Sequence, residues 1–202
     1  MLNMVSRKSL LLFGVVLALC AFVLPSVASA AGFEPAGAGA LGTGTIDSGT
    51  LGFSIPGLNS GSACTSSQFH VQVHSTTVAT ITAGRFANCH GSVGGAVGCT
   101  TTATGVGFPW TATAESTSNI VIHNANVHVV FETTPGTLNE CSYTGLPMRL
   151  TGSVTASFTA ATKTFDFGAG GSGFFTHIPG VGTLPTVVRG QATATGLLNV
   201  LD

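Results

Sequence analysis

Histidine is the residue type that first suggests chemistry in this chain of 202 residues, because it serves both metal binding and proton transfer. His70 and His74 have the spacing at which two imidazoles on one helix can share a zinc ion. On a β-strand the same residues would stand ~13 Å apart, too far for one ion with ~2 Å bonds. His123 and His128, five apart, would point to opposite faces. The surrounding sequence alternates as strands do, so we expect no metal site. The other two histidines lie beside turns: His90 and His177.

Hydrolase patterns are matched only in part. A serine hydrolase usually carries G-x-S-x-G where a strand meets a helix, and Gly170-Gly171-Ser172-Gly173 lacks the final glycine and the helix. Glycosidases need two carboxyl groups on facing strands, but no spacing selects a pair here. The acids available are Glu115, Glu132, Glu140 and Asp166. The sequence therefore predicts no catalytic residues and no cofactor, and leaves open a site assembled from distant strands.

Phe108-Pro109-Trp110 is the segment with the clearest ligand-binding potential, and Trp110 is the single tryptophan. One interpretation is a core anchor whose indole N–H is hydrogen-bonded at the sheet edge. The other makes Phe108 and Trp110 the wall of a ligand pocket.

The elements that would position these residues alternate with a period of two. In Phe69 to His74 the apolar residues point one way and the polar ones the other, which is typical of a half-buried antiparallel strand. Turn residues such as Gly91 to Gly98 and Pro179-Gly180 separate such segments, and none has a sustained helical period. We therefore expect one all-β domain over residues 50–202, an antiparallel β-sandwich or barrel. The further expected strands are Val78 to Phe86, Trp110 to Ala114, Ile120 to Phe131, Leu150 to Phe158, Thr164 to Phe167 and Val187 to Thr195.

The first 30 residues have the composition of a signal peptide. Arg7 and Lys8 precede an apolar run from Leu10 to Leu24, and Ala28-Ser29-Ala30 supplies the small residues of a cleavage site. At about 15 residues the run is shorter than the ~20 that a membrane-spanning helix needs. We expect cleavage after Ala30, a secreted or cell-envelope protein without a membrane span, and a flexible Gly/Ala-rich lead at 31–49.

Charge is scarce: Asp, Glu, Lys and Arg make up 6% of the chain, against ~25% in ordinary soluble domains. Two of the 6 Lys and Arg residues lie in the predicted signal peptide. Four cations would thus face 7 acids in the remaining 172 residues, for a net charge of −3. Without a basic patch, nucleic acid is a poor partner. A hydroxyl-rich, nearly uncharged surface suits a second copy of the chain, a wall polymer or lipid.

Four of the 5 cysteines remain once Cys20 leaves with the signal peptide, so two disulfides are expected in an exported chain. The pairing Cys64–Cys89 fits a hairpin and leaves Cys99 with Cys141. The local pair of Cys89 with Cys99 stays open as an alternative.

The hairpin that supports Cys64–Cys89 would turn at Ser75 to Val78, because the two cysteines lie equally far from that segment. The same register pairs Val71 with Thr82. It also places Phe69 and Phe86 on one face of the sheet.

Short motifs around these cysteines resemble a loose group of uncharacterised exported proteins common in actinobacteria. They are Cys64 to Phe69, Ile81 to Cys89, Phe108 to Thr111 and Cys141-Ser142-Tyr143-Thr144-Gly145. The resemblance spans about Cys64 to Phe167 and implies a disulfide-linked β domain. It implies no activity and no site residues.

Two functions fit these observations best. The leading one is a secreted or envelope-associated, non-catalytic β domain with a structural or interaction role. The alternative is an extracellular binding module that encloses a small apolar ligand such as a lipid, and a cavity of ~300 Å³ or more would favour it. A hydrolase with converging His, Ser and carboxylate groups is a third class.

Overall fold

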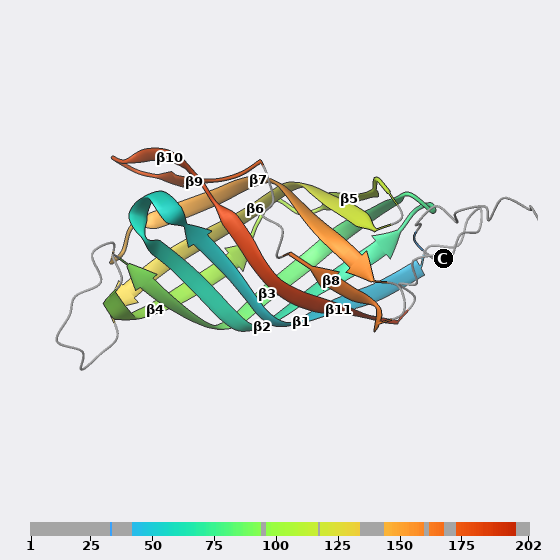
Figure 1. Ribbon diagram of the computed structural model, residues 1–202, viewed down its shortest axis with the longest axis horizontal. Helices are drawn as coiled ribbons and strands as arrows, with labels where there is room; N and C mark the ends of the chain where they lie inside the picture. Colours follow the sequence, from blue (N-terminus) through green and yellow to red (C-terminus); the bar gives the residue numbers. More distant parts are fainter. Residues whose placement is uncertain are drawn as a thin grey trace, which may run out of the picture.

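The computed structural model describes residues 33, 42–93, 96–116, 118–133, 144–159, 162–167 and 173–196, and almost all of them lie in antiparallel strands (Figure 1). The elements are β1 (Gly42–Ile55), the 3-10 turn η1 (Pro56–Leu58), β2 (Ser60–Val73), β3 (Val78–Val93), β4 (Ala96–Gly105), β5 (Trp110–Ala114), β6 (Asn119–Thr133), β7 (Pro147–Thr159), β8 (Thr164–Asp166), β9 (Phe174–Ile178), β10 (Gly182–Pro185) and β11 (Val187–Gly196). The predicted all-β class is confirmed. No helix in the described residues has the length and apolar character to cross a bilayer.

The sheet closes into a barrel of eight strands because β6 and β7 pair with each other. Around the barrel the order is β7, β8, β11, β1, β2, β3, β4, β6 and back to β7. β4 and β5 occupy the same place in the barrel wall, between β3 and β6. β4 pairs with one stretch of these two strands, and β5 pairs with the next stretch. β9 pairs with β7 beyond the end of β8, and β10 forms the free edge of the sheet.

The barrel interior is the hydrophobic core, as expected for eight strands, whose lumen is only wide enough for side chains to fill. In β2 the side chains of Phe69, Val71 and Val73 are buried, whereas Gln68 and His70 are exposed. The alternation predicted for this segment is therefore confirmed, with its apolar side turned into the barrel.

The β2–β3 hairpin has the predicted register from Cys64 to His70 and then shifts by one residue. Val71 pairs with Ile81, not with Thr82. Thr82 is the extra residue of a β-bulge on β3, and such a bulge moves every later pair by one position. The sequence pattern did not reveal the bulge. Thr82 and Ala83 are both exposed, so no buried apolar residue marks the point at which the pairing shifts.

The disulfide Cys64–Cys89 is present and joins directly opposed residues of β2 and β3. Phe69 and Phe86 share a face, with ring centroids 5.4 Å apart. Cys99 is also disulfide-bonded. Its predicted partner, Cys141, lies outside the described residues, so that pairing stays a prediction.

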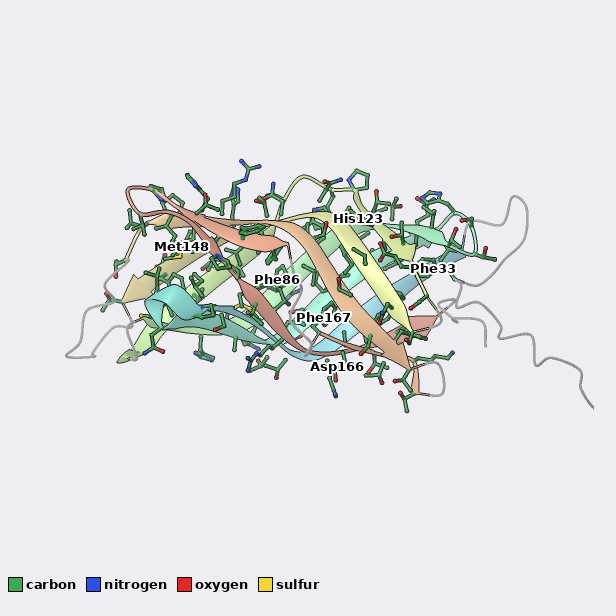
Figure 2. The ribbon with its side chains drawn as sticks, turned by 45° about the horizontal axis from the view of Figure 1, so that its top comes forward. Phe33, Phe86, His123, Met148, Asp166 and Phe167 are labelled. Carbon is green, nitrogen blue, oxygen red and sulfur yellow. A yellow bond between two sulfur atoms is a disulfide. The ribbon has the colours of Figure 1, made fainter. Side chains whose placement is uncertain are left out.

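The barrel begins earlier than residue 50. β1 starts at Gly42 and pairs on both sides, with β2 and β11. Phe33 is buried, and its backbone N–H donates to the carbonyl oxygen of Thr76 in the β2–β3 turn (Figure 2). Phe33 and the first part of β1 lie in the segment assigned to the lead, where abundant glycine and alanine hide any alternation. The predicted signal peptide lies outside the described residues.

Candidate functional site

The predicted pocket wall belongs to the core. Trp110 is buried and its ring stacks on Phe108 with centroids 4.4 Å apart. The indole N–H donates to the carbonyl oxygen of Val106 at 2.9 Å. This hydrogen bond satisfies the single polar group of the side chain, so Trp110 acts as a core anchor where β4 gives way to β5.

The interior has little free volume in the described part of the chain. The apolar cavity beside Trp110 measures about 50 Å³, and a second one near Phe33 about 20 Å³. Sites that enclose small molecules usually measure about 300 Å³ or more. Neither of these two cavities has room for a lipid.

His123 is the histidine with the closest polar neighbours. Its Nε2 lies 2.8 Å from the Thr113 hydroxyl on β5, and its Nδ1 lies 3.5 Å from the Ser153 hydroxyl on β7. Hydroxyl groups thus face both ring nitrogens, and among the described residues no carboxylate holds the ring as one does in a catalytic triad. The ring links three neighbouring strands on the outer face.

The other histidines do not converge. They are exposed on the outer face or at turns: His70, His74, His90, His128 and His177. His74 contacts the Thr80 hydroxyl, and His177 contacts that of Thr183. Within the described ranges no three His, Cys, Asp or Glu side chains come close enough to hold a metal ion. The expectation that the protein binds no metal stays a prediction.

The carboxylates are also dispersed. Glu132 lies near the end of β6, whereas Asp166 on β8 is level with Asn119 at the start of that strand. Thirteen residues separate these two levels along β6, and β7 lies between β6 and β8, so the register does not place the two carboxyl groups opposite each other as a glycosidase requires. Glu115 lies in the β5–β6 turn. Glu140 and Ser172 lie outside the described residues.

The large apolar side chains that are exposed in the described residues lie on or beside the β9–β10 hairpin, with the exposed His177–Thr183 pair between Phe175 and the turn. Phe175 is 43% exposed and pairs directly with Pro185, and Val181 in the turn is 49% exposed. Leu146, just before β7, is 36% exposed. The pairing of β7 with β9 brings the start of β7 and the β9–β10 turn to the same end of the barrel (Figure 1). We call Leu146, Phe175, Val181 and Pro185 the apolar hairpin face.

Sequence reasoning did not identify this face, although one local pattern points to it. Phe174 and Phe175 are consecutive, and a strand sends consecutive side chains to opposite sides. Phe174 is 2% exposed in the core, so Phe175 must face outward. Large apolar residues that face solvent together often mark interaction sites.

The fold and its surface thus define a class: an antiparallel β-barrel with a filled interior and an exposed apolar hairpin. A family model described as alkane oxidation protein activator PraA/PraB-like matches residues 4–184. The chain belongs to this PraA/PraB-like family. Searches of curated proteins and of solved structures gave no match. The word activator in the family description indicates an accessory, non-catalytic role.

Proposed function

We propose that the protein is an exported, non-catalytic accessory protein that promotes alkane oxidation by contact through its outer face. The family description supplies the link to alkane oxidation. The observation that carries the mode of action is the pairing of a filled interior with an exposed apolar hairpin face. Neither of the two cavities described inside the barrel, of about 50 and 20 Å³, can enclose a long-chain alkane, which favours contact on the outside.

The apolar hairpin face suits a hydrocarbon or lipid surface. Phe175 and Val181 lose water-exposed apolar area when they touch such a surface, which is favourable by about 25 cal/mol per Å². The whole chain has only 6 Lys and Arg and 7 Asp and Glu, and one of these cations, Arg149, lies beside the hairpin opposite His177. Contact through a few side chains is weak and reversible, which suits an accessory protein that must release its target.

Oxygen uptake tests this proposal in alkane-oxidising cells that lack the protein. Adding the purified mature chain should raise uptake on hexadecane but not on hexadecanol, because the effect lies in delivery of the alkane. The double variant Phe175→Ser/Val181→Ser should lose more than half of the stimulation and keep its thermal unfolding temperature, since both side chains are exposed.

The control variant replaces four polar residues outside the apolar hairpin face with alanine: His70, His74, Glu132 and Asp166. The first three are exposed, and Asp166 is half-buried. This variant should stimulate uptake as the unmodified chain does. Equal stimulation on hexadecanol, or full activity of the Phe175→Ser/Val181→Ser variant, would contradict the proposed contact. Loss of stimulation in the alanine variant without loss of folding would indicate a chemical role and contradict the non-catalytic assignment.

Export makes a separate prediction. The N-terminal sequence of protein recovered from the culture medium or envelope should begin at Ala31, since Ala28 and Ala30 fit the peptidase specificity. Phe33, which is buried, would then be the third residue of the mature chain. A mature chain that begins more than a few residues from Ala31, or that retains Met1, would refute the predicted cleavage.

A further inference from the structure

A hollow of about 430 Å³ lies on the outer face over β1, β2 and β3. One row of residues forms its floor and two sides. Each residue in this row lies directly opposite the next one on the neighbouring strand. Directly opposed residues project from the same side of a sheet. From β11 to β3 the row is Arg189, Gly52, Ala63 and His90.

Small residues form the floor between two longer exposed side chains. Gly52 and Ala63 occupy the middle of the row, and Gly61 lines the hollow beside them. Arg189 and His90 are exposed at its two sides. Three inter-strand steps of ~4.8 Å place their backbones about 14 Å apart, which leaves an open floor between the side chains.

Polar groups close one end of this outer hollow. Asn59 follows η1 in a left-handed conformation with φ of 46°, and Ser54 lies two residues beyond Gly52 on β1. Both line the hollow. An amide and a hydroxyl therefore stand within the same site as a guanidinium and an imidazole.

The guanidinium of Arg189 makes no hydrogen bond or ion pair to another side chain in the described part of the chain. None of the described residues that line the hollow is acidic. Glu132 lies two strands beyond His90 in the same row, separated from it by Thr100. A guanidinium presents a planar fork of donors that matches a carboxylate. The charge of the hollow therefore favours an anionic ligand.

We propose that the outer hollow binds a carboxylate-bearing sugar, such as the uronic acid units of an extracellular polysaccharide. Arg189 would bind the carboxylate, while Asn59, Ser54 and His90 would bind ring hydroxyls. The low floor at Gly52 and Ala63 lets one face of a pyranose ring approach the sheet closely. The volume of about 430 Å³ lies within the range of small-molecule sites, ~300–1,000 Å³, and exceeds what a single inorganic anion fills. This site goes beyond the proposed function and uses none of the residues of the apolar hairpin face.

An NMR titration of the isotopically labelled mature chain tests the ligand class with three probes. Galacturonate should shift the backbone amide signals of Gly52, Gly61 and Ala63 in a saturable way. Galactose, which lacks the carboxylate, and inorganic phosphate, which lacks the ring, should each bind at least about tenfold more weakly, the factor expected from one charge-assisted hydrogen bond. Phosphate or galactose binding as tightly as galacturonate, or the absence of saturable shifts, would overturn the proposal.

Two variants test the geometry of the site. Arg189→Gln should weaken galacturonate binding at least about tenfold, whereas the matched control Arg85→Gln, on the same barrel outside the hollow, should not. Gly52→Thr should abolish binding by filling the floor. The chain should still fold, because a Cβ at Gly52 meets no atom closer than 3.5 Å. Unchanged affinity in either hollow variant would exclude the proposed mode of binding.

Discussion

Loss of the Cys64–Cys89 disulfide is expected to lower the free energy of unfolding by about 3–4 kcal/mol, the chain-entropy value for a loop of this length. The two cysteines are 25 residues apart and lie inside the barrel, with Cys64 fully buried. Small domains are stable by only about 5–15 kcal/mol. The bond therefore accounts for a large part of the total stability, and its loss should also reduce the exported yield.

The measurement is urea unfolding of the double variant Cys64→Ala/Cys89→Ala, which leaves no unpaired thiol at these positions to react with Cys99 or Cys141. Ser66→Ala, an exposed change on the same strand, serves as the control and should stay within about 0.5 kcal/mol of the unmodified chain. A loss below about 1 kcal/mol in the double variant would show that β-sheet pairing alone holds the hairpin together.

The hairpin carrying this disulfide was predictable because its information is local. Cys64 and Cys89 are equidistant from one turn, and the alternation of Phe69 to His74 identifies the buried side. The bulge at Thr82 was not predictable, because nothing in an exposed Thr-Ala pair distinguishes the extra residue from a paired one. Local pattern therefore gave the partners and the face but not the full register.

Strands with little alternation were predicted only in part or not at all. β1 consists largely of glycine, threonine and serine, and β4 begins at Ala96, inside the expected turn from Gly91 to Gly98. These strands form because neighbours pair with them on both sides and supply their backbone hydrogen bonds. Pairing of that kind depends on the whole barrel, and its closure through β6 and β7 leaves no mark on a local window of sequence.

The candidate sites likewise divide into features that depend on local sequence and features that depend on the pairing of distant strands. Trp110 could be predicted as a core anchor, because a buried indole needs only one hydrogen-bond partner, for its single N–H group. The outer hollow was not predictable, since it needs the register of four strands to bring Arg189, Gly52 and His90 into one row. The apolar hairpin face was predictable in part. The pair Phe174-Phe175 implies that one phenylalanine is exposed, but it does not show which one.

Replacing Gly152 with alanine is expected to destabilise the barrel by about 3 kcal/mol or more, because two independent costs coincide. Gly152 has a φ of +136°, a conformation that residues with a side chain rarely adopt. A Cβ there would also lie 1.9 Å from the carbonyl oxygen of Gly173. That carbonyl accepts a hydrogen bond from the N–H of Ser153, so it cannot move away without breaking a contact between β7 and the start of β9.

Gly152 cannot relax easily because it is the partner of a bulge. The register of β6 with β7 shifts between Ile122 and Ala125, and Gly152 lies opposite Ala125. Bulges bend a barrel wall sharply, and the strand facing the bend must approach its neighbour closely. The β1–β11 pair repeats this arrangement at Gly190, where a Cβ would lie 1.9 Å from the Thr50 carbonyl oxygen.

Gly182→Ala is the matched control for Gly152→Ala, because Gly182 also has a strongly positive φ, +117°, but has no atom within 4 Å of a Cβ built there. It should cost only about 1–2 kcal/mol, the conformational penalty alone. Thermal and urea unfolding of both variants separate the collision from the backbone strain. Equal destabilisation by the two substitutions would mean that the approach of Gly173 to β7 contributes nothing to the barrel, whereas a clearly larger loss at Gly152 would identify this bend as a point at which the wall tolerates no side chain.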